Sequence, residues 1–136
     1  MADDLTVAVY QATQSFPREE IYGITSQIRR AACLVPANIV EGSSRESRKD
    51  YLHFLHISRG SLSETQYFVH LSRRLGYLSD ANAEQLIGQT RQTFACLHGL
   101  IKAVDWEAGK LNKMVATITS LLVLGLWSRG QWSVVS

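Results

Sequence analysis

The sequence predicts an all-α protein that folds as an antiparallel up-and-down four-helix bundle. Its 136 residues, 46% hydrophobic and 19% charged with only two prolines, suit about one soluble globular domain. Hydrophobic residues recur at spacings of three and four in four successive stretches, and the connections between these stretches are short. No alternation typical of strands persists. Together these observations favour a helix bundle.

The first two helices are separated at Phe16 and Pro17. Leu5, Val9 and Phe16 lie on one stripe of the first helix, which we expect to end before Pro17. The second helix is expected to begin near residue 18, because proline and acidic residues suit a helix N-terminus. Pro36 either kinks or ends this helix, and the periodicity that continues to residues 39 and 40 favours a kink. Its apolar seam repeats nearly every 3.5 residues: Ile21, Ile24, Ile28, Ala31 or Ala32, Val35 and Ile39.

The third helix is predicted to begin near Glu46 or Ser47, after the break at residues 42–44, and to run to about Leu75. Two apolar stripes can be traced on it. The first comprises Tyr51, Leu55, Ser58, Leu62, Thr65 and Val69. The second comprises Phe54, Ile57, Ser61, Phe68, Leu71 or Ser72, and Leu75. We therefore expect this helix to be covered on one side by its own bundle and on the other by a neighbouring subunit.

The fourth helix is expected to start after the turn at residues 76–80, with Ser79 or Asp80 as its N-cap. Its inward stripe runs from Ala83 to Val104, and residues 105–113 continue it with polar side chains. We place the bundle domain at residues 1–113 and treat residues 114–136 as an apolar tail that either docks or stays mobile, with a loop at 128–132. The apolar run at 114–127 is shorter than the roughly 20 residues that a membrane-spanning helix needs. No membrane association is expected.

Catalytic and metal sites are not indicated. Cys33 and Cys96 lie far apart in predicted helices and imply neither a disulfide nor a metal site. Asp50, His53 and His56 are spaced by threes and could share a helix face, but the other helices offer no further ligands. Nucleophile elbows, phosphate-binding glycine loops and paired carboxylates are absent from the sequence. We therefore expect no catalytic residue, no metal and no cofactor, and hence no enzyme.

Cationic residues are the strongest candidates for a binding site. The net charge is only +2, so a nucleic-acid site requires a local patch, and residues 29–49 hold five Arg or Lys against two Glu. An alternative is that some arginines hold helices or subunits together, and Arg30, Glu41 and Glu64 are candidates for such salt bridges. The candidate nucleic-acid-binding residues are Arg29, Arg45, Arg48, Lys49, Arg59, Arg73 and Arg74.

Several ordered motifs resemble one bacterial family. They are the run from Phe16-Pro17 to Gly23, residues 27–32, the stretch from Pro36 to Gly42, residues 51–64 and residues 75–78. Over about residues 5–105 the chain resembles the small four-helix-bundle proteins related to those encoded in intervening sequences of 23S rRNA genes. The resemblance implies an antiparallel bundle that assembles into a ring, commonly a homopentamer. It also extends to accessory proteins of diversity-generating retroelements, which implies binding of a reverse transcriptase and of RNA or DNA through a positively charged surface.

The chain departs from the family pattern at both ends. It lacks a tryptophan often found near the start, and the tail beyond Met114 exceeds the usual length. The acidic N-terminus is unlike a secretory signal, so we expect a cytoplasmic protein. The predicted function is a non-enzymatic homo-oligomer that binds nucleic acid or a ribonucleoprotein. The alternative is a protein-interaction scaffold with no nucleic-acid role.

Overall fold

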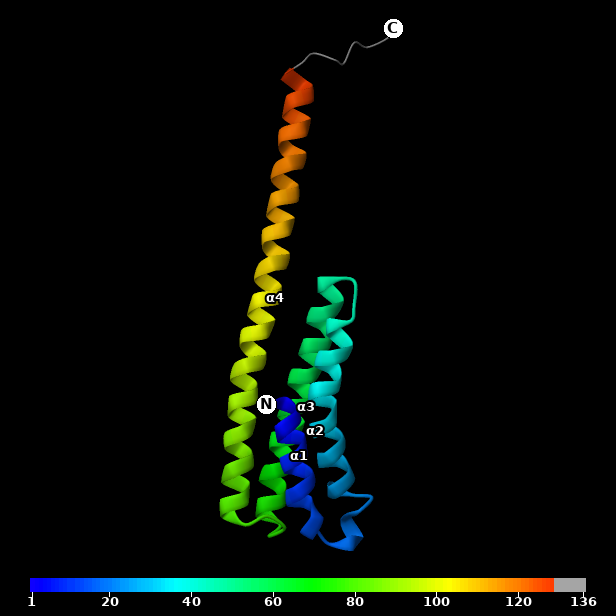
Figure 1. Cartoon of the computed structure of the whole chain (residues 1–136), viewed down its shortest axis with the longest axis vertical. Coiled ribbons are helices and arrows are strands. Elements are labelled where there is room, and N and C mark those ends of the chain that lie inside the picture. Colours follow the sequence, from blue (N-terminus) through cyan, green and yellow to red (C-terminus); the bar gives the residue numbers. More distant parts are fainter. Residues whose placement is uncertain (129–136) are drawn as a thin grey trace.

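A computed structural model describes residues 1–128 of the chain, with side chains described as far as Leu121. The described residues form four α-helices and no strand, which confirms the predicted all-α class (Figure 1). The helices are α1 (Ala2–Ala12), α2 (Ile24–Ser43), α3 (Arg48–Arg74) and α4 (Asp80–Ser128). Successive helices run in opposite directions, and α1 packs against both α2 and α4. Residues 129–132 of the expected loop lie outside the described residues.

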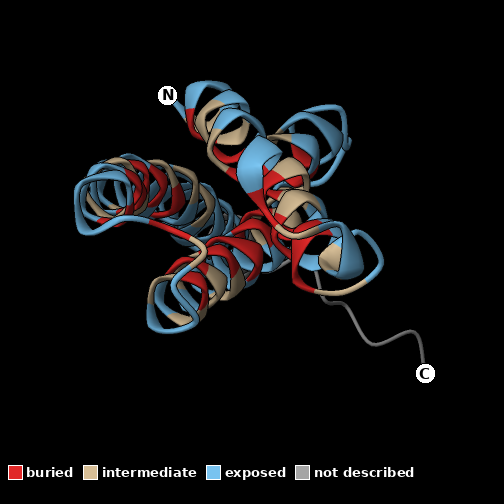
Figure 2. Cartoon of the chain, turned by 90° about the horizontal axis from the view of Figure 1, so that it is seen from below, coloured by how far each residue is buried: buried red, intermediate tan, exposed pale blue. Residues whose placement is uncertain are grey.

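The core lies along the axis enclosed by the four helices, where the buried parts of the ribbons face one another (Figure 2). Each helix contributes apolar residues to it, such as Val9, Ile28, Leu62 and Leu97. Hydroxyl-bearing side chains fill much of the remaining space. The buried polar residues are Thr13, Thr25, Asn38, Ser58, Ser61, Thr65, Ser72, Thr90 and Thr93. Small hydroxyl side chains let the helix backbones approach closely while bonding to nearby carbonyls.

Helix α2 begins at Ile24, six residues later than the sequence predicted. Residues 18–20 form only a single 3₁₀ turn. The cause is Glu20, whose Oε2 accepts a hydrogen bond of 3.0 Å from the backbone N–H of Ile24 and so caps the helix at that point. Ile21, predicted to face the core, is therefore exposed, and Tyr22 is 93% exposed.

Helix α2 continues through Pro36, so the proline does not end it. Proline has no N–H to donate to the carbonyl four residues earlier, which leaves the carbonyl of Ala32 without its helical partner. Thr6 of α1 replaces that partner, since its hydroxyl donates to the Ala32 oxygen over 2.9 Å. The carbonyl that Pro36 leaves unpaired in α2 is thus one of the groups that bind α1.

Helices α2 and α3 approach each other closely at Gly42. A β-carbon at that position would lie 2.8 Å from Phe54 and Tyr51 of α3, closer than packed atoms tolerate. About two turns away from Gly42 along α2, the buried Ser58 hydroxyl of α3 donates to the Val35 carbonyl of α2 over 2.8 Å. The connection between these helices, residues 44–47, is called the tip below. It ends at Ser47, whose Oγ accepts a 3.0 Å hydrogen bond from the N–H of Asp50 and caps α3. The helix begins at Arg48, close to the predicted start.

The first stripe of α3 is buried apart from the half-buried Tyr51, and the second is covered only in part. Phe54 of the second stripe lies against Gly42 of α2. Ser61 and Ser72 of the second stripe are buried, while Phe54, Phe68 and Leu71 are half-buried, and Ile57 and Leu75 remain exposed. The expectation that a neighbouring subunit covers the second stripe stays a prediction.

Helix α4 has 49 residues, against 20 in α2 and 27 in α3. It starts at Asp80 with Ser79 as its N-cap, as predicted. It then continues past residue 113 as one helix that projects beyond the tip (Figure 1). No helix among residues 1–128 is long and apolar enough to cross a membrane.

We predict that Thr6→Val lowers the free energy of unfolding by about 1–2 kcal/mol, because it leaves the Ala32 carbonyl without a partner. In a Pro36→Ala background, the introduced alanine supplies the missing N–H, so the same change should cost about 1 kcal/mol less. Denaturant unfolding of the wild type, both single variants and the double variant measures this coupling. Equal costs of Thr6→Val in the two backgrounds would contradict it.

The Tyr77–Glu20 contact should make stability depend on pH in the alkaline range. The Tyr77 hydroxyl donates to Glu20 Oε1 over 3.0 Å, and this hydrogen bond raises the pKa of Tyr77 above its usual 10.0. The contribution should be present in full below that usual pKa and disappear as the pH rises through the raised value. We expect Tyr77→Phe to be less stable than the wild type at about pH 8 and the difference to shrink toward about pH 11. Chemical unfolding at the two pH values tests this, and a constant difference would count against it.

Candidate nucleic-acid interface

The seven candidate cationic residues are spread along the length of the bundle. Arg29 lies near the start of α2, Arg59 lies midway along α3, and Arg73 and Arg74 lie at its end. Arg45, Arg48 and Lys49 alone gather, at the tip. Helix rise places Arg29 on the order of 20 Å from the tip. The charge run at residues 29–49 is therefore not one surface patch.

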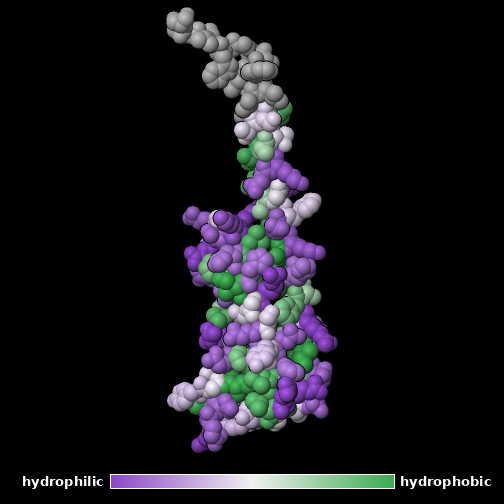
Figure 3. Space-filling view, turned by 180° about the vertical axis from the view of Figure 1, so that it is seen from behind, coloured by the Kyte–Doolittle hydropathy of each residue, from purple (hydrophilic) through white to green (hydrophobic). Residues whose placement is uncertain are grey.

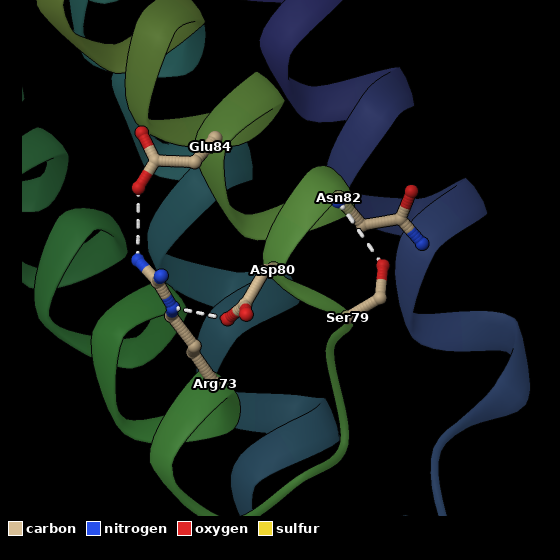
Figure 4. A network of polar contacts seen from close by, with 5 residues as sticks. All are labelled: Arg73, Ser79, Asp80, Asn82 and Glu84. Carbon is tan, nitrogen blue, oxygen red and sulfur yellow. Dashed lines mark hydrogen bonds and ion pairs between the residues drawn. The ribbon is translucent and has the colours of Figure 1, made fainter.

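Arg29 and Arg73 are engaged by groups of their own chain. Arg29 Nε donates to Thr13 Oγ1 over 2.8 Å, and its guanidinium lies 4.8 Å from the centre of the Tyr10 ring. Arg73 bonds Asp80 Oδ1 and Glu84 Oε1, each at 2.8 Å, which ties the end of α3 to the first turns of α4 (Figure 4). Both arginines therefore join helices within the bundle.

The three residues expected to form structural salt bridges do not form one group. Arg30 Nη2 lies 3.7 Å from Glu64 Oε1, joining α2 to α3. Glu41 instead pairs with Arg45, one turn further along the chain. Both pairs are substantially exposed, so each contributes little to stability on its own.

At the tip, Arg48 joins the start of α3 to α4. Its Nη2 lies 2.9 Å from Glu107 Oε2. Arg45 lies over the ring of Phe54, 4.8 Å from its centre. Lys49 is exposed and forms no ion pair with any described residue. These contacts bring the cationic start of α3 alongside α4 at the level of Glu107.

Helix α4 contributes three residues at this level that the sequence argument missed: Trp106, Lys110 and Lys113. They are spaced by four and three, which places them on one face of the helix. They line a hollow of about 350 Å³ together with Asp105 and Gly109, and Trp106 is 75% exposed. Residues 105–113 were interpreted only as a polar continuation of α4. The tryptophan placed among lysines at helical spacing was the available signal.

Lys110 also lines a second hollow of about 300 Å³ with Arg48 and Glu107, completed by Leu111 and Met114. Lys110 therefore connects the face of Trp106 to the cationic start of α3. We call the set Arg45, Arg48, Lys49, Trp106, Lys110 and Lys113 the tip surface. It carries five cationic side chains and an exposed indole, with Glu41 and Glu107 as paired anions.

The histidine pattern on α3 lies beside the tip surface. Asp50, His53 and His56 are all exposed, and Asp50 Oδ2 already accepts a 2.7 Å hydrogen bond from the Ser47 hydroxyl. No three His, Cys, Asp or Glu side chains of the described residues come together in a way that could hold a metal ion.

The chain is similar to one protein family in sequence and to a solved structure in fold. The profile of the 23S rRNA-intervening sequence protein family matches residues 1–99. The crystal structure of a protein of unknown function from the S23 ribosomal protein family of Bacteroides thetaiotaomicron is similar in fold, with a TM-score of 0.66 and 23% sequence identity. The alignment covers 74% of this chain and 94% of that one. No curated protein matches the chain. Trp106, Lys110 and Lys113 lie beyond the matched residues.

Proposed function

This chain belongs to the 23S rRNA-intervening sequence protein family, and we propose that it is a non-enzymatic protein that binds RNA, alone or within a ribonucleoprotein, through the tip surface. The observation that carries this proposal is Trp106, a largely exposed indole on the same helix face as Lys110 and Lys113. The family name refers to the location of such genes and leaves the activity open.

An exposed aromatic ring beside cationic groups suits unpaired bases. Bases stack on aromatic side chains while lysine or arginine holds the adjoining phosphates. Proteins that recognise RNA commonly bind the unstacked bases of loops and bulges in this way. The tip surface offers one ring for stacking, with Lys110 and Lys113 one and two turns further along α4. An RNA hairpin, with a duplex stem and an unpaired loop, is therefore the expected class of ligand.

The ion pairs at the tip do not prevent phosphate binding. The side chains of Arg45 and Glu41 are 44% and 49% exposed, and those of Arg48 and Glu107 are 45% and 64% exposed. Exposed pairs are weak, so a phosphate can replace the carboxylate as the partner of the arginine. Binding of this kind weakens steeply as salt concentration rises.

The alternative function is a protein-interaction scaffold. It is favoured by the engagement of Arg29, Arg45, Arg48 and Arg73 with groups of the same chain, which accounts for four of the seven candidate residues without a ligand. The reverse transcriptase that the family resemblance implies as a partner belongs to this alternative. Assembly into a homopentameric ring is likewise a proposal that rests on the resemblance.

We predict that the full chain retains a hairpin RNA at low salt and releases it at high salt. Trp106→Ala should weaken binding roughly tenfold through loss of stacking, and Trp106→Phe should keep most of the affinity. Lys110→Glu with Lys113→Glu should reduce the salt slope of the affinity by about two, since about one unit is lost for each phosphate contact. Fluorescence anisotropy of labelled RNA over a salt series measures these effects.

The matched control reverses two exposed cations far from the tip, Arg18→Glu with Arg91→Glu, and should leave the affinity and salt slope nearly unchanged. Equal losses in both double variants would mean that net charge, and not the tip surface, determines binding. Absence of binding by the wild type at low salt would reject the RNA proposal. Partner capture that survives nuclease treatment and reversal of Arg45, Arg48 and Lys49 to glutamate would instead support the scaffold.

A further inference from the structure

The apolar stripe of α4 continues without a break from the bundle into the projecting part of the helix. Within the bundle it comprises Ala83, Leu86, Thr90, Thr93, Leu97 and Ile101, all buried. Val104 and Ala108 continue it at the same spacing and are half-buried. Beyond the tip it consists of Leu111, Val115 and Ile118, which we call the outer stripe, and these side chains are about half exposed. Met114 and Leu121 flank the outer stripe and are exposed as well.

The alternating three- and four-residue spacing is that of a helix that packs along a second helix. Over residues 83–101 the packing partners are α1 and α3 of the same chain. Above the tip no described element of this chain lies against α4, and hydrophobic side chains are visible along the bare helix (Figure 3). The outer stripe therefore extends an existing helix-packing surface into a part of the helix where the described chain supplies no partner.

We propose that the outer stripe binds the outer stripe of a second copy of this chain, with the two helices antiparallel. Residues 108–128 give each copy 21 helical residues, or about six turns along which the stripe can pair. Self-pairing at this stripe leaves Trp106 and Lys113 uncovered, because these two residues lie on a different face of α4.

The side of α4 on which the outer stripe lies determines that the two helices are antiparallel. Leu111 and Met114 line a hollow with Arg48, so this side of α4 faces the space directly above the tip. A parallel partner helix would have to continue downward through the space that α2 and α3 occupy. An antiparallel partner ends above the tip, and its own bundle lies at the far end of the paired segment. About 30 Å of helix, from residue 108 to residue 128, is then available for pairing.

The composition of the projecting segment favours a second copy over a lipid surface. Residues 114–128 contain no charged residue, so two copies brought together meet no like-charge repulsion. Helices that lie on membranes carry Lys or Arg along the polar face, whereas beyond Lys113 the face opposite the outer stripe holds Thr117 and Ser120. The hydroxyls of Thr117 and Thr119 donate to the carbonyls of Lys113 and Val115, each over 2.8 Å, and need no outside partner.

The test compares two double variants of the full chain by sedimentation velocity over a concentration series. Val115→Lys with Ile118→Lys places two charges on the outer stripe, and we expect its assembly mass to be half that of the wild type. Thr117→Lys with Ser120→Lys places the same charges on the opposite face and should keep the wild-type mass. All four positions are exposed, so helix content measured by circular dichroism should be unchanged in both variants.

A wild type that stays monomeric throughout the series would overturn the proposal, as would the same mass change in both variants. Wild-type chain that stays monomeric but co-sediments with neutral phosphatidylcholine vesicles through the outer stripe would assign the stripe to lipid and also overturn it.

Orientation is tested with single cysteines in a chain that carries Cys33→Ser and Cys96→Ser. In an antiparallel pair that uses residues 108–128, position 118 lies near the centre and position 111 near one end. Ile118→Cys should therefore form a disulfide between two copies on oxidation, and Leu111→Cys should not. Efficient cross-linking at both positions would show a parallel pair and overturn the proposed orientation.

Discussion

The difference in length between α4 and its neighbours determines where the two candidate interaction surfaces of this molecule lie. Helices α2 and α3 form a hairpin that ends at the tip, while α4 continues from the level of Glu107 to Ser128. Below the tip, α4 buries its apolar stripe against the chain itself. At the tip, the cationic start of α3 meets a face of α4 that carries Trp106. Above the tip, the same helix has no neighbour in the described chain, so both candidate interaction surfaces are consequences of one long helix in a short bundle.

Much of the fold could be predicted from local signals. The three- and four-residue spacing identified four helices, and Ser47 and Ser79 marked two helix starts because their caps are formed within three residues. The start of α2 was wrong by six residues, since it depends on the carboxylate of Glu20, which Tyr77 holds from 57 residues away in the sequence. The second stripe of α3 predicts a neighbouring subunit, but a helix between two neighbours of its own chain also needs two apolar faces. Sequence spacing alone does not distinguish these cases.

The candidate site could be predicted less well than the fold. Residues that are adjacent in a charge run separate along antiparallel helices, as Arg29 and Arg45 do. Arg48 and Glu107, 59 residues apart in sequence, instead come into contact. The ion pairs of Arg73 arise only because α3 and α4 turn back on each other at residues 75–79. The spacing of Trp106, Lys110 and Lys113 was visible in the sequence, but the exposure of the indole was not.

The hydroxyl-lined interior has a consequence for how stability varies with temperature. Among the described residues, nine polar ones are buried alongside sixteen hydrophobic ones, and several of them face the seams where α2, α3 and α4 meet. Exposure of apolar surface raises the heat capacity of the unfolded chain, whereas exposure of polar surface lowers it. Unfolding this interior therefore changes the heat capacity less than unfolding a leucine-filled bundle of equal size would. We therefore expect a less strongly curved dependence of stability on temperature, so that cooling weakens the bundle less than it would weaken a leucine-filled one.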